Sequence, residues 1–361
     1  MNTQRIASFE WGRVAALCAV ITLHAQAFLT APLINDKPWI GMIINQSCRF
    51  AVPLFFLLAG YFIMPKLKRA PWETFRQYAT PLLTVWLAWS VIYLLMPFNF
   101  TTVIEQGYLT ERSGYWQYLL SNPLNTLFEG GLVHLWYIPG LLCGLAVMAQ
   151  LCNMQQQKWL LPVGITLYAY GLSAGSYEPI FMTESPIFTR NGPFFSTLLL
   201  TVGFTFRHHN IHASKPVAIM LAVVGMMMHF AEAFFLTRYD MLFIEHDYLI
   251  GTPFWTAGIF LFLAGNRTLG TSDVVSQLSQ RTLGVYLCHL LVLVVLMNVL
   301  PLLGLPLFIE DILRIALCIV LSFGLVVLIE RSPLSPWLLR PRTKPPVEPC
   351  ASQSKTQSHS A

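Results

Sequence analysis

The sequence predicts an all-α protein that crosses a membrane several times, and three observations support this prediction. Of the 361 residues, 55% are hydrophobic and only 11% are charged, whereas a soluble domain has about 25% charged residues. The mean hydropathy is +0.58. Apolar runs long enough to span a bilayer recur along the chain, and the loops between them alternate in charge. We therefore expect about ten transmembrane helices within a membrane-embedded domain at 1–335, followed by a cytoplasmic, disordered tail at 336–361.

The predicted helices correspond to ten apolar segments. They are residues 11–31, 40–64, 78–98, 131–151, 158–174, 193–207, 215–236, 249–265, 282–303 and 310–330. The fifth, sixth and eighth are the shortest of the set. The longest connections predicted are the loops 99–130 and 174–192, which are rich in aromatic residues and include Arg190. Such rings are typical of the interfacial belt of membrane proteins, although they also suit stacking on a sugar.

The charges of the loops predict the orientation of the chain. Basic residues concentrate in alternate loops, and the remaining loops carry most of the acidic ones. The basic set is Arg5, Lys66, Lys68, Arg69, Arg76, Lys158, Arg207, Lys215, Arg267, Arg281 and residues 331–344. Because cytoplasmic loops are enriched in Lys and Arg, both termini are predicted to be cytoplasmic.

The net charge of +5 does not indicate a nucleic-acid partner, because the cations follow the loops of a membrane protein. The seven cysteines have no metal-ligand spacing, and most lie inside apolar runs, where they pack as small hydrophobic residues. His208, His209 and His212 lie together in a loop without a nearby acidic or cysteine partner. We therefore predict no metal site.

Arg13 and His24 are the most informative pair in the sequence. Ten residues separate them on the first apolar segment, so on an α-helix they share a face and lie about 16 Å apart along the axis. Ionisable groups within a bilayer are costly and usually face a cavity or a partner. On the predicted topology Arg13 lies towards the cytoplasm and His24 towards the outer side. The two residues would then mark the ends of one path across the bilayer.

Three further polar groups lie in apolar segments, and each allows two interpretations. Arg49 is predicted at about the depth of His24, either in a functional site or extending to the outer headgroups. His134 and Trp136 stand at the outer end of the fourth segment, as site residues or as belt and packing residues. His289 lies well inside the ninth segment, as a functional group or as a histidine that makes the usual inter-helix hydrogen bond.

Several separated motifs together resemble the bacterial integral-membrane acyltransferase family 3. They are the R/K-x10-H pair Arg13 and His24, the R-x-x-V-P-L-F-F…G-Y stretch from Arg49 to Tyr61, His134-Leu-Trp136, the S-x-x-T-x-G-x-Y-L-x-H run ending at His289, and Glu330-Arg331. The resemblance covers roughly residues 8–335. It is closest to the branch that stands alone without an appended extracytoplasmic domain.

The resemblance implies an O-acyltransferase of the bacterial inner membrane. Such a protein moves an acyl group, most often acetyl, from cytoplasmic acyl-coenzyme A to a hydroxyl of a surface glycan or lipid-linked sugar, with no permanently bound cofactor. It implies catalytic roles for His24, Arg49, His134 and Glu330, donor binding by Arg13, Glu10, Lys68, Arg69 and Arg76, and acceptor binding by Trp136, Arg190 and His289. His24 would act as a general base or as a transient acyl carrier.

The sequence departs from the family pattern at three places. Ala59 stands where the family usually has serine, Glu10 stands for an aspartate, and the R-x-x-R motif is half present at Arg76 and Ala79. A proton-coupled transporter or flippase is the alternative, because intramembrane Arg and His residues also suit a conduction pathway. The sequence does not specify the acceptor sugar, the acyl chain or the oligomeric state.

Overall fold

The computed structural model describes residues 5–339, and within this range the chain consists of helices and the loops that join them. The α-helices are α1 (Ala7–His24), α2 (Trp39–Ser47), α3 (Ala51–Arg69), α4 (Pro71–Leu95), α5 (Phe100–Gln106), α6 (Tyr108–Ser121), α7 (Pro123–Glu129), α8 (Tyr137–Asn153), α9 (Leu160–Ser173), α10 (Glu178–Phe181), α11 (Pro193–His208), α12 (Lys215–Leu236), α13 (Gly251–Gly265), α14 (Asp273–Val299), α15 (Leu307–Glu330) and α16 (Ser335–Leu338). Short 3-10 helices are η1 (Val133–Trp136), η2 (Gln157–Trp159), η3 (Thr237–Tyr239) and η4 (Leu300–Leu303). The all-α class is confirmed.

Each of the ten predicted segments contains a helix, but fewer meet the requirements for a span. In residues 5–339, six helices are long and apolar enough to cross a membrane. They are Trp39–Arg69, Pro71–Leu95, Val133–Asn153, Lys215–Tyr239, Asp273–Leu303 and Leu307–Glu330. α1, α9, α11 and α13 are shorter than the roughly 20 residues that a perpendicular span needs. The count of about ten spans and the placement of the termini therefore stay predictions.

The predicted segment 40–64 consists of two helices, α2 and α3, separated by a turn at residues 48–50. Pro53 explains the break, since proline has no N–H to donate to the carbonyl four residues earlier, which belongs to Arg49. Arg49 therefore lies in the turn between two helices, where its side chain is partly buried. This position makes it part of a loop-built site at the beginning of α3.

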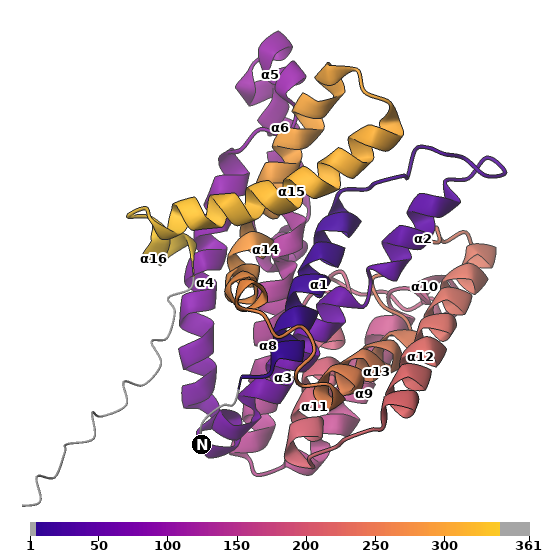
Figure 1. Ribbon diagram of the computed structural model, residues 1–361, viewed down its shortest axis with the longest axis vertical. Helices are drawn as coiled ribbons and strands as arrows, with labels where there is room; N and C mark the ends of the chain where they lie inside the picture. The colour runs from indigo at the N-terminus through magenta and orange to yellow at the C-terminus, as the bar shows by residue number, and fades with distance from the viewer. Residues whose placement is uncertain (1–4, 340–361) are drawn as a thin grey trace, which may run out of the picture.

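Residues 99–130, predicted as a loop, form the three helices α5, α6 and α7. The Asn99 side chain caps α5 by accepting a hydrogen bond from the Thr102 N–H at 2.9 Å, and Pro123 begins α7. Arg112 is fully buried beneath the rings of Phe98 and Tyr115. Many of the aromatic residues expected in an interfacial belt therefore pack within a small helical extension, drawn at the top of Figure 1.

The start of the predicted tail packs against the helices. α16 follows α15 and contacts α4, where the Trp89 indole donates a hydrogen bond to the Leu338 carbonyl at 2.9 Å. The remainder of the predicted tail, residues 340–361, lies outside the described residues.

α1 is central to the arrangement, because it contacts α3, α13, α14 and α15. Figure 1 shows α15 crossing obliquely over α14 and α1. Near the beginning of α15, the Arg314 guanidinium donates to the Ala25 carbonyl at 3.1 Å, and the Asp311 carboxylate accepts from the Phe28 N–H at 2.7 Å. These bonds hold the segment that follows α1 and so position His24, its last residue.

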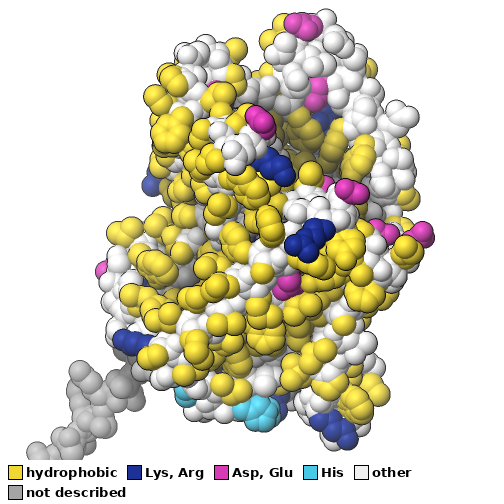
Figure 2. Space-filling model, turned by 90° about the vertical axis from the view of Figure 1, so that its right-hand side faces the viewer, with side chains coloured by type: hydrophobic (Ala, Val, Ile, Leu, Met, Phe, Trp, Pro, Cys, Tyr) yellow, Lys and Arg dark blue, Asp and Glu magenta, His cyan; other side chains and the backbone are white. Residues whose placement is uncertain are grey.

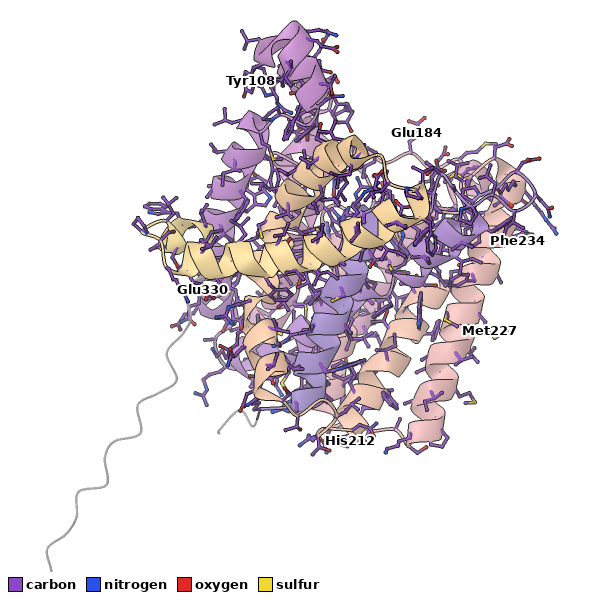
Figure 3. All side chains as sticks on the ribbon, turned by 45° about the horizontal axis from the view of Figure 1, so that its top comes forward. Tyr108, Glu184, His212, Met227, Phe234 and Glu330 are labelled. Carbon is purple, nitrogen blue, oxygen red and sulfur yellow. The ribbon has the colours of Figure 1, made fainter. Side chains whose placement is uncertain are left out.

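The two ends of the helix bundle differ in their side chains. In Figure 3, Tyr108 and Glu184 lie at one end and His212 at the other. Figure 2 shows a broad band of hydrophobic side chains on the face it presents, with most acidic side chains in its upper half and histidines at the lower edge. Following the predicted sidedness, we call the end that carries α5–α7 the outer end and the end that carries His212 the inner end.

Gly60 and Gly203 allow α3 and α11 to approach closely. A Cβ atom at Gly60 would lie 1.9 Å from the carbonyl oxygen of Leu200, and one at Gly203 would lie 1.9 Å from that of Leu57. Both neighbours are backbone atoms, so a side-chain rotation cannot make room. Small residues of this kind bring membrane helices into van der Waals contact.

We expect Gly60→Ala to destabilise the protein by at least about 1–3 kcal/mol, because it forces the two helices apart. The measurement is the thermal unfolding midpoint of the purified protein in detergent. Gly324→Ala in α15 is the matched control, since a Cβ there meets nothing within 4 Å. Equal midpoints for the two variants would contradict the close approach of α3 and α11.

Candidate active site

A cavity of about 1280 Å³ lies among α1, α3, α4, α8, α14 and α15. Its wall includes Arg13, Lys66 and Gln77, together with Arg281 and Glu330, and it also has many apolar side chains. Typical small-molecule pockets have volumes of about 300–1,000 Å³. This cavity is therefore large enough for a long ligand with a charged part and an apolar part.

Arg13 supplies to this cavity a positive charge that takes part in no ion pair among the described residues. Its guanidinium carbon lies 5.0 Å from the centre of the Phe62 ring, and within residues 5–339 no carboxylate lies within 4.0 Å of its nitrogens. Arg281, another cation on the wall, differs from Arg13 because it is already paired. Its guanidinium lies 2.9 Å from the Glu330 carboxylate and donates several hydrogen bonds to it. Arg13 can therefore bind an anion without first breaking an ion pair.

Tyr137 and Tyr286 border the cavity on the side of the buried histidines. Both line its wall, and their ring centres are 5.4 Å apart. The Tyr286 ring also lies 5.6 Å from that of His134 and 5.8 Å from that of His289, and its hydroxyl donates a hydrogen bond to the His134 carbonyl. The two tyrosines thus stand between the cavity and a group of histidines.

Three histidines from separate helical segments meet at this point. The ring centres of His24 and His289 are 5.3 Å apart, those of His134 and His289 are 5.2 Å apart, and those of His24 and His134 are 6.4 Å apart. His134 and His289 are fully buried, whereas His24 is partly accessible. We call His24, His134 and His289 the histidine cluster. His24 is its member best placed to meet a substrate.

An ion network lies towards the outer end, within electrostatic range of His24. The Asp247 carboxylate joins two guanidiniums, at 2.6 Å from Arg49 and 3.0 Å from Arg190. Arg190 also pairs with Glu129 at 2.7 Å, and Arg49 donates to the Ile244 carbonyl at 2.6 Å. The network joins the turn before α3 to three outer segments that are far apart in the sequence.

Asp247 stays ionised at neutral pH in this network. Burial alone raises its pKa, but the guanidiniums of Arg190 and Arg49 outweigh burial and hold the pKa below its usual value. A smaller cavity of about 360 Å³ lies beside the network and is lined by Arg190, Asp247, Asn125 and Phe188, among others. Its wall offers charged, amide and aromatic groups in one place.

A comparison with protein-family models identifies the family of this chain. The model described as an acyltransferase domain matches residues 6–331, which is nearly the whole chain. The chain belongs to the membrane acyltransferase family 3. The resemblance seen in the sequence motifs is therefore confirmed, and acyl transfer is the class of reaction that the family supports.

Among curated proteins, the acyltransferase is similar to members named as racemases. It is 25% identical to an amino-acid racemase of Enterococcus faecalis over 88% of this chain and 45% of that protein. It is also 25% identical to a serine/alanine racemase of Enterococcus gallinarum over 64% of this chain and 34% of that protein. The chain thus spans less than half the length of these relatives, and their names describe the whole proteins. No solved structure matches it.

The predicted donor-binding residues of the acyltransferase separate into two groups. Arg13 lines the large cavity, as does Lys66, whereas Lys68, Arg69 and Arg76 are exposed and do not line it. Lys68 instead lies 3.3 Å from a ring nitrogen of His208. Glu10 pairs with Arg5 at 2.9 Å and accepts a hydrogen bond from Ser276.

The predicted catalytic residues of the acyltransferase also lie in different places. His24 and His134 are in the histidine cluster, together with His289, which the sequence motifs assigned to acceptor binding. Arg49 is in the ion network. Glu330 lies on the cavity wall beside Arg281, which precedes His289 by eight residues and so by about 12 Å along α14. The geometry gives Glu330 the position of a residue that holds Arg281.

The predicted acceptor residues Trp136 and Arg190 have different surroundings. Trp136 is partly buried, with its ring centre 6.2 Å from that of Phe56 and 5.9 Å from that of Phe195. Arg190 contributes to the ion network and to the smaller cavity. Arg190 is therefore the better placed of the two to meet a polar ligand.

Sequence reasoning missed four residues that border the site. Tyr137 and Tyr286 are adjacent to or within the quoted motifs, so their position near His134 and His289 offered a signal. Asp247 and Glu129 are among the acidic residues of the loops predicted to lie on the outer side. Nothing in the sequence pairs them with Arg49 or Arg190, because the partners lie on separate segments.

Proposed function

We propose that this acyltransferase moves an acyl group, most simply acetyl, from cytoplasmic acyl-coenzyme A to a hydroxyl of a surface glycan or lipid-linked sugar. Transfer would take place within the inner membrane of a bacterium and deliver the product to the outer face. The proposal depends on the positions of two residues on one face of α1. Arg13, which has no ion-pair partner among the described residues, lines the large cavity, and His24 lies outside the cavity, behind the Tyr286 ring and next to His289.

The large cavity fits the donor. Coenzyme A has phosphates at one end and a thioester at the other, joined by a long flexible arm. Arg13 and Lys66 would attract the phosphates, because a guanidinium and an ammonium group both bind phosphate oxygens. The arm would follow the apolar wall towards Tyr137 and Tyr286. These rings would move apart for the thioester to reach His24, since His24 does not line the cavity.

His24 would act as the general base in the transfer step. The acceptor hydroxyl loses its proton to His24 as its oxygen forms a bond to the acyl carbon. The carbon–sulfur bond of the thioester then breaks, and the proton passes from His24 to the coenzyme A sulfur. The products are the acylated sugar and free coenzyme A, so the atoms balance without another reactant.

The ion network fits the acceptor side of this reaction. Arg49 lies within electrostatic range of His24, and its charge would favour the oxyanion that develops on the acyl carbonyl. The smaller cavity, with Arg190 and Phe188 on its wall, has the polar and aromatic groups that bind a sugar ring. It contains Glu245 and Asp247 as well as Arg190, which favours an uncharged sugar over an anionic one at this position.

The test uses inside-out membrane vesicles from cells that lack the gene, with and without the protein restored. These vesicles present the cytoplasmic face to added acetyl-CoA and contain the natural acceptor. With acetyl-CoA radiolabelled in the acetyl group, we expect label in the glycan fraction only when the protein is present. Mass spectrometry of that fraction should then show the mass of one or more acetyl groups.

Two outcomes would count against the proposal. One is glycan without label from vesicles that contain the folded protein. The other is movement of a glycan or solute across the membrane without label, which would favour the transporter or flippase alternative.

A further inference from the structure

Two members of the histidine cluster have their tautomers set by backbone carbonyls. The His289 Nδ1 lies 2.6 Å from the Tyr286 carbonyl oxygen, and the His134 Nε2 lies 3.3 Å from the Leu287 carbonyl oxygen. A carbonyl has no proton to donate, so each of these nitrogens carries the proton of a neutral ring. The other nitrogen of each ring, Nε2 of His289 and Nδ1 of His134, then has a free lone pair.

Both free nitrogens are buried and have no hydrogen-bond partner. Buried polar atoms are usually paired, and an unpaired one costs about 1–3 kcal/mol. Within residues 5–339, these side chains are also not arranged to hold a metal ion. The unpaired lone pairs therefore require a proton donor, and the cluster itself contains one candidate.

His24 is that candidate. A neutral imidazole has one nitrogen with a lone pair and one with a proton, so if His24 presents the first to a substrate, the second is free to donate its N–H. Two imidazoles joined by one hydrogen bond have ring centres about 5 Å apart, since the N···N distance is about 2.9 Å. The separation of 5.3 Å between His24 and His289 meets this requirement after a small side-chain rotation, and the 6.4 Å between His24 and His134 does not. His134 does not compete for His289, because its proton is already donated to Leu287.

We propose that His289 is the positioning residue of the reaction, accepting the N–H of His24 at its Nε2 and so keeping the other nitrogen of His24 bare for the acceptor hydroxyl. This proposal rests on the proposed function. The arrangement does for His24 what a carboxylate does in a Ser-His-Asp triad, but with a neutral acceptor. A neutral partner suits this depth, where an unpaired carboxylate would be costly. No carboxylate lies within 4.0 Å of the His24 ring in the described part of the chain.

Two amide substitutions separate this role from a merely structural one. His289→Gln places an oxygen near the position of the ring Nε2 and so keeps the acceptor for His24. His289→Asn places its amide near the position of Nδ1, so it keeps the bond to the Tyr286 carbonyl but loses the acceptor. The two variants differ by one methylene group and share the same chemistry, which makes each the control for the other.

The experiment measures the initial rate of label transfer in the inside-out vesicles as a function of acetyl-CoA concentration, at equal amounts of protein in the membrane. We expect His289→Gln to keep kcat within about 10-fold of wild type. His289→Asn and His289→Leu should lose about 100-fold or more, in the range of general-base effects. The KM for acetyl-CoA should change less than 2-fold in all three, which a general loss of folding would not produce.

Three results would overturn the inference. They are a His289→Asn variant more active than His289→Gln, a His289→Gln variant as inactive as His289→Leu, or a loss seen only in KM. Wild-type protein in the same vesicles separates this failure from that of the proposed function. If the wild type transfers no label, the proposed function fails; if it transfers label and the variants rank otherwise, only the role of His289 fails.

Discussion

Replacing His24 with alanine is expected to lower the rate of acyl transfer by about 10²–10⁴-fold, the usual contribution of a positioned general base. His24 is the accessible member of the histidine cluster, so its loss removes the only imidazole there that can meet a substrate directly. The amount of protein in the membrane should stay unchanged, because within residues 5–339 this ring makes no ion pair and no hydrogen bond to the backbone, and its one proposed partner is the neighbouring ring of His289. The measurement is label transfer from acetyl-CoA to glycan in inside-out vesicles.

His212→Ala is the control for this variant, since His212 is an exposed loop residue at the inner end of the molecule (Figure 3) and makes no ring contact with the cluster. Wild-type glycan acylation in the His24 variant would remove His24 from the mechanism. The same assay distinguishes the two roles considered for His24. Label retained on wild-type protein in the absence of acceptor, and lost with His24, would identify an acyl carrier rather than a general base.

Replacing Arg13 with glutamine should raise the KM for acetyl-CoA by about 10- to 100-fold with a smaller effect on kcat. A hydrogen bond to a charged group contributes about 1.5–3 kcal/mol, and each 1.4 kcal/mol is a factor of ten in binding. Arg13 pairs with no carboxylate within 4.0 Å in the described residues, so its charge is available to a ligand and its removal leaves no buried anion unpaired.

Lys158→Gln is the matched control for Arg13→Gln. It removes one positive charge from the predicted cytoplasmic side at an exposed position that does not line the cavity. The KM for acetyl-CoA should be unaffected there. If the KM responds equally to both changes, the effect is one of overall surface charge, and Arg13 has no special role in donor capture.

The placement of the two ends of the proposed path was predictable, because it depends on one helix. The 3.6-residue period puts Arg13 and His24 on the same face of α1 whatever surrounds it. The same reasoning predicted a helix in each apolar segment. At 40–64 the predicted helix is interrupted by a turn at residues 48–50, which divides it into α2 and α3, and at 99–130 three short helices replace a predicted loop.

Which residues form the site was less predictable, because this depends on contacts between helices. Lys68, Arg69 and Arg76 are close in sequence to Lys66, but only Lys66 lines the cavity. Lys68 is turned about 200° from Lys66 around α3, Arg69 is the last residue of that helix, and Arg76 belongs to α4. Glu330 was assigned to catalysis by a motif, and the structure places it beside Arg281.

By itself, the sequence determined the helical class, the family and the one-helix geometry that places Arg13 and His24 about 16 Å apart. These features follow from composition, order and the period of the helix. The tertiary structure alone decided that His134 and His289 join His24, and that Asp247 lies between Arg49 and Arg190. A sequence period specifies which side chains share a face, but the rotation and crossing of packed helices specify which faces meet.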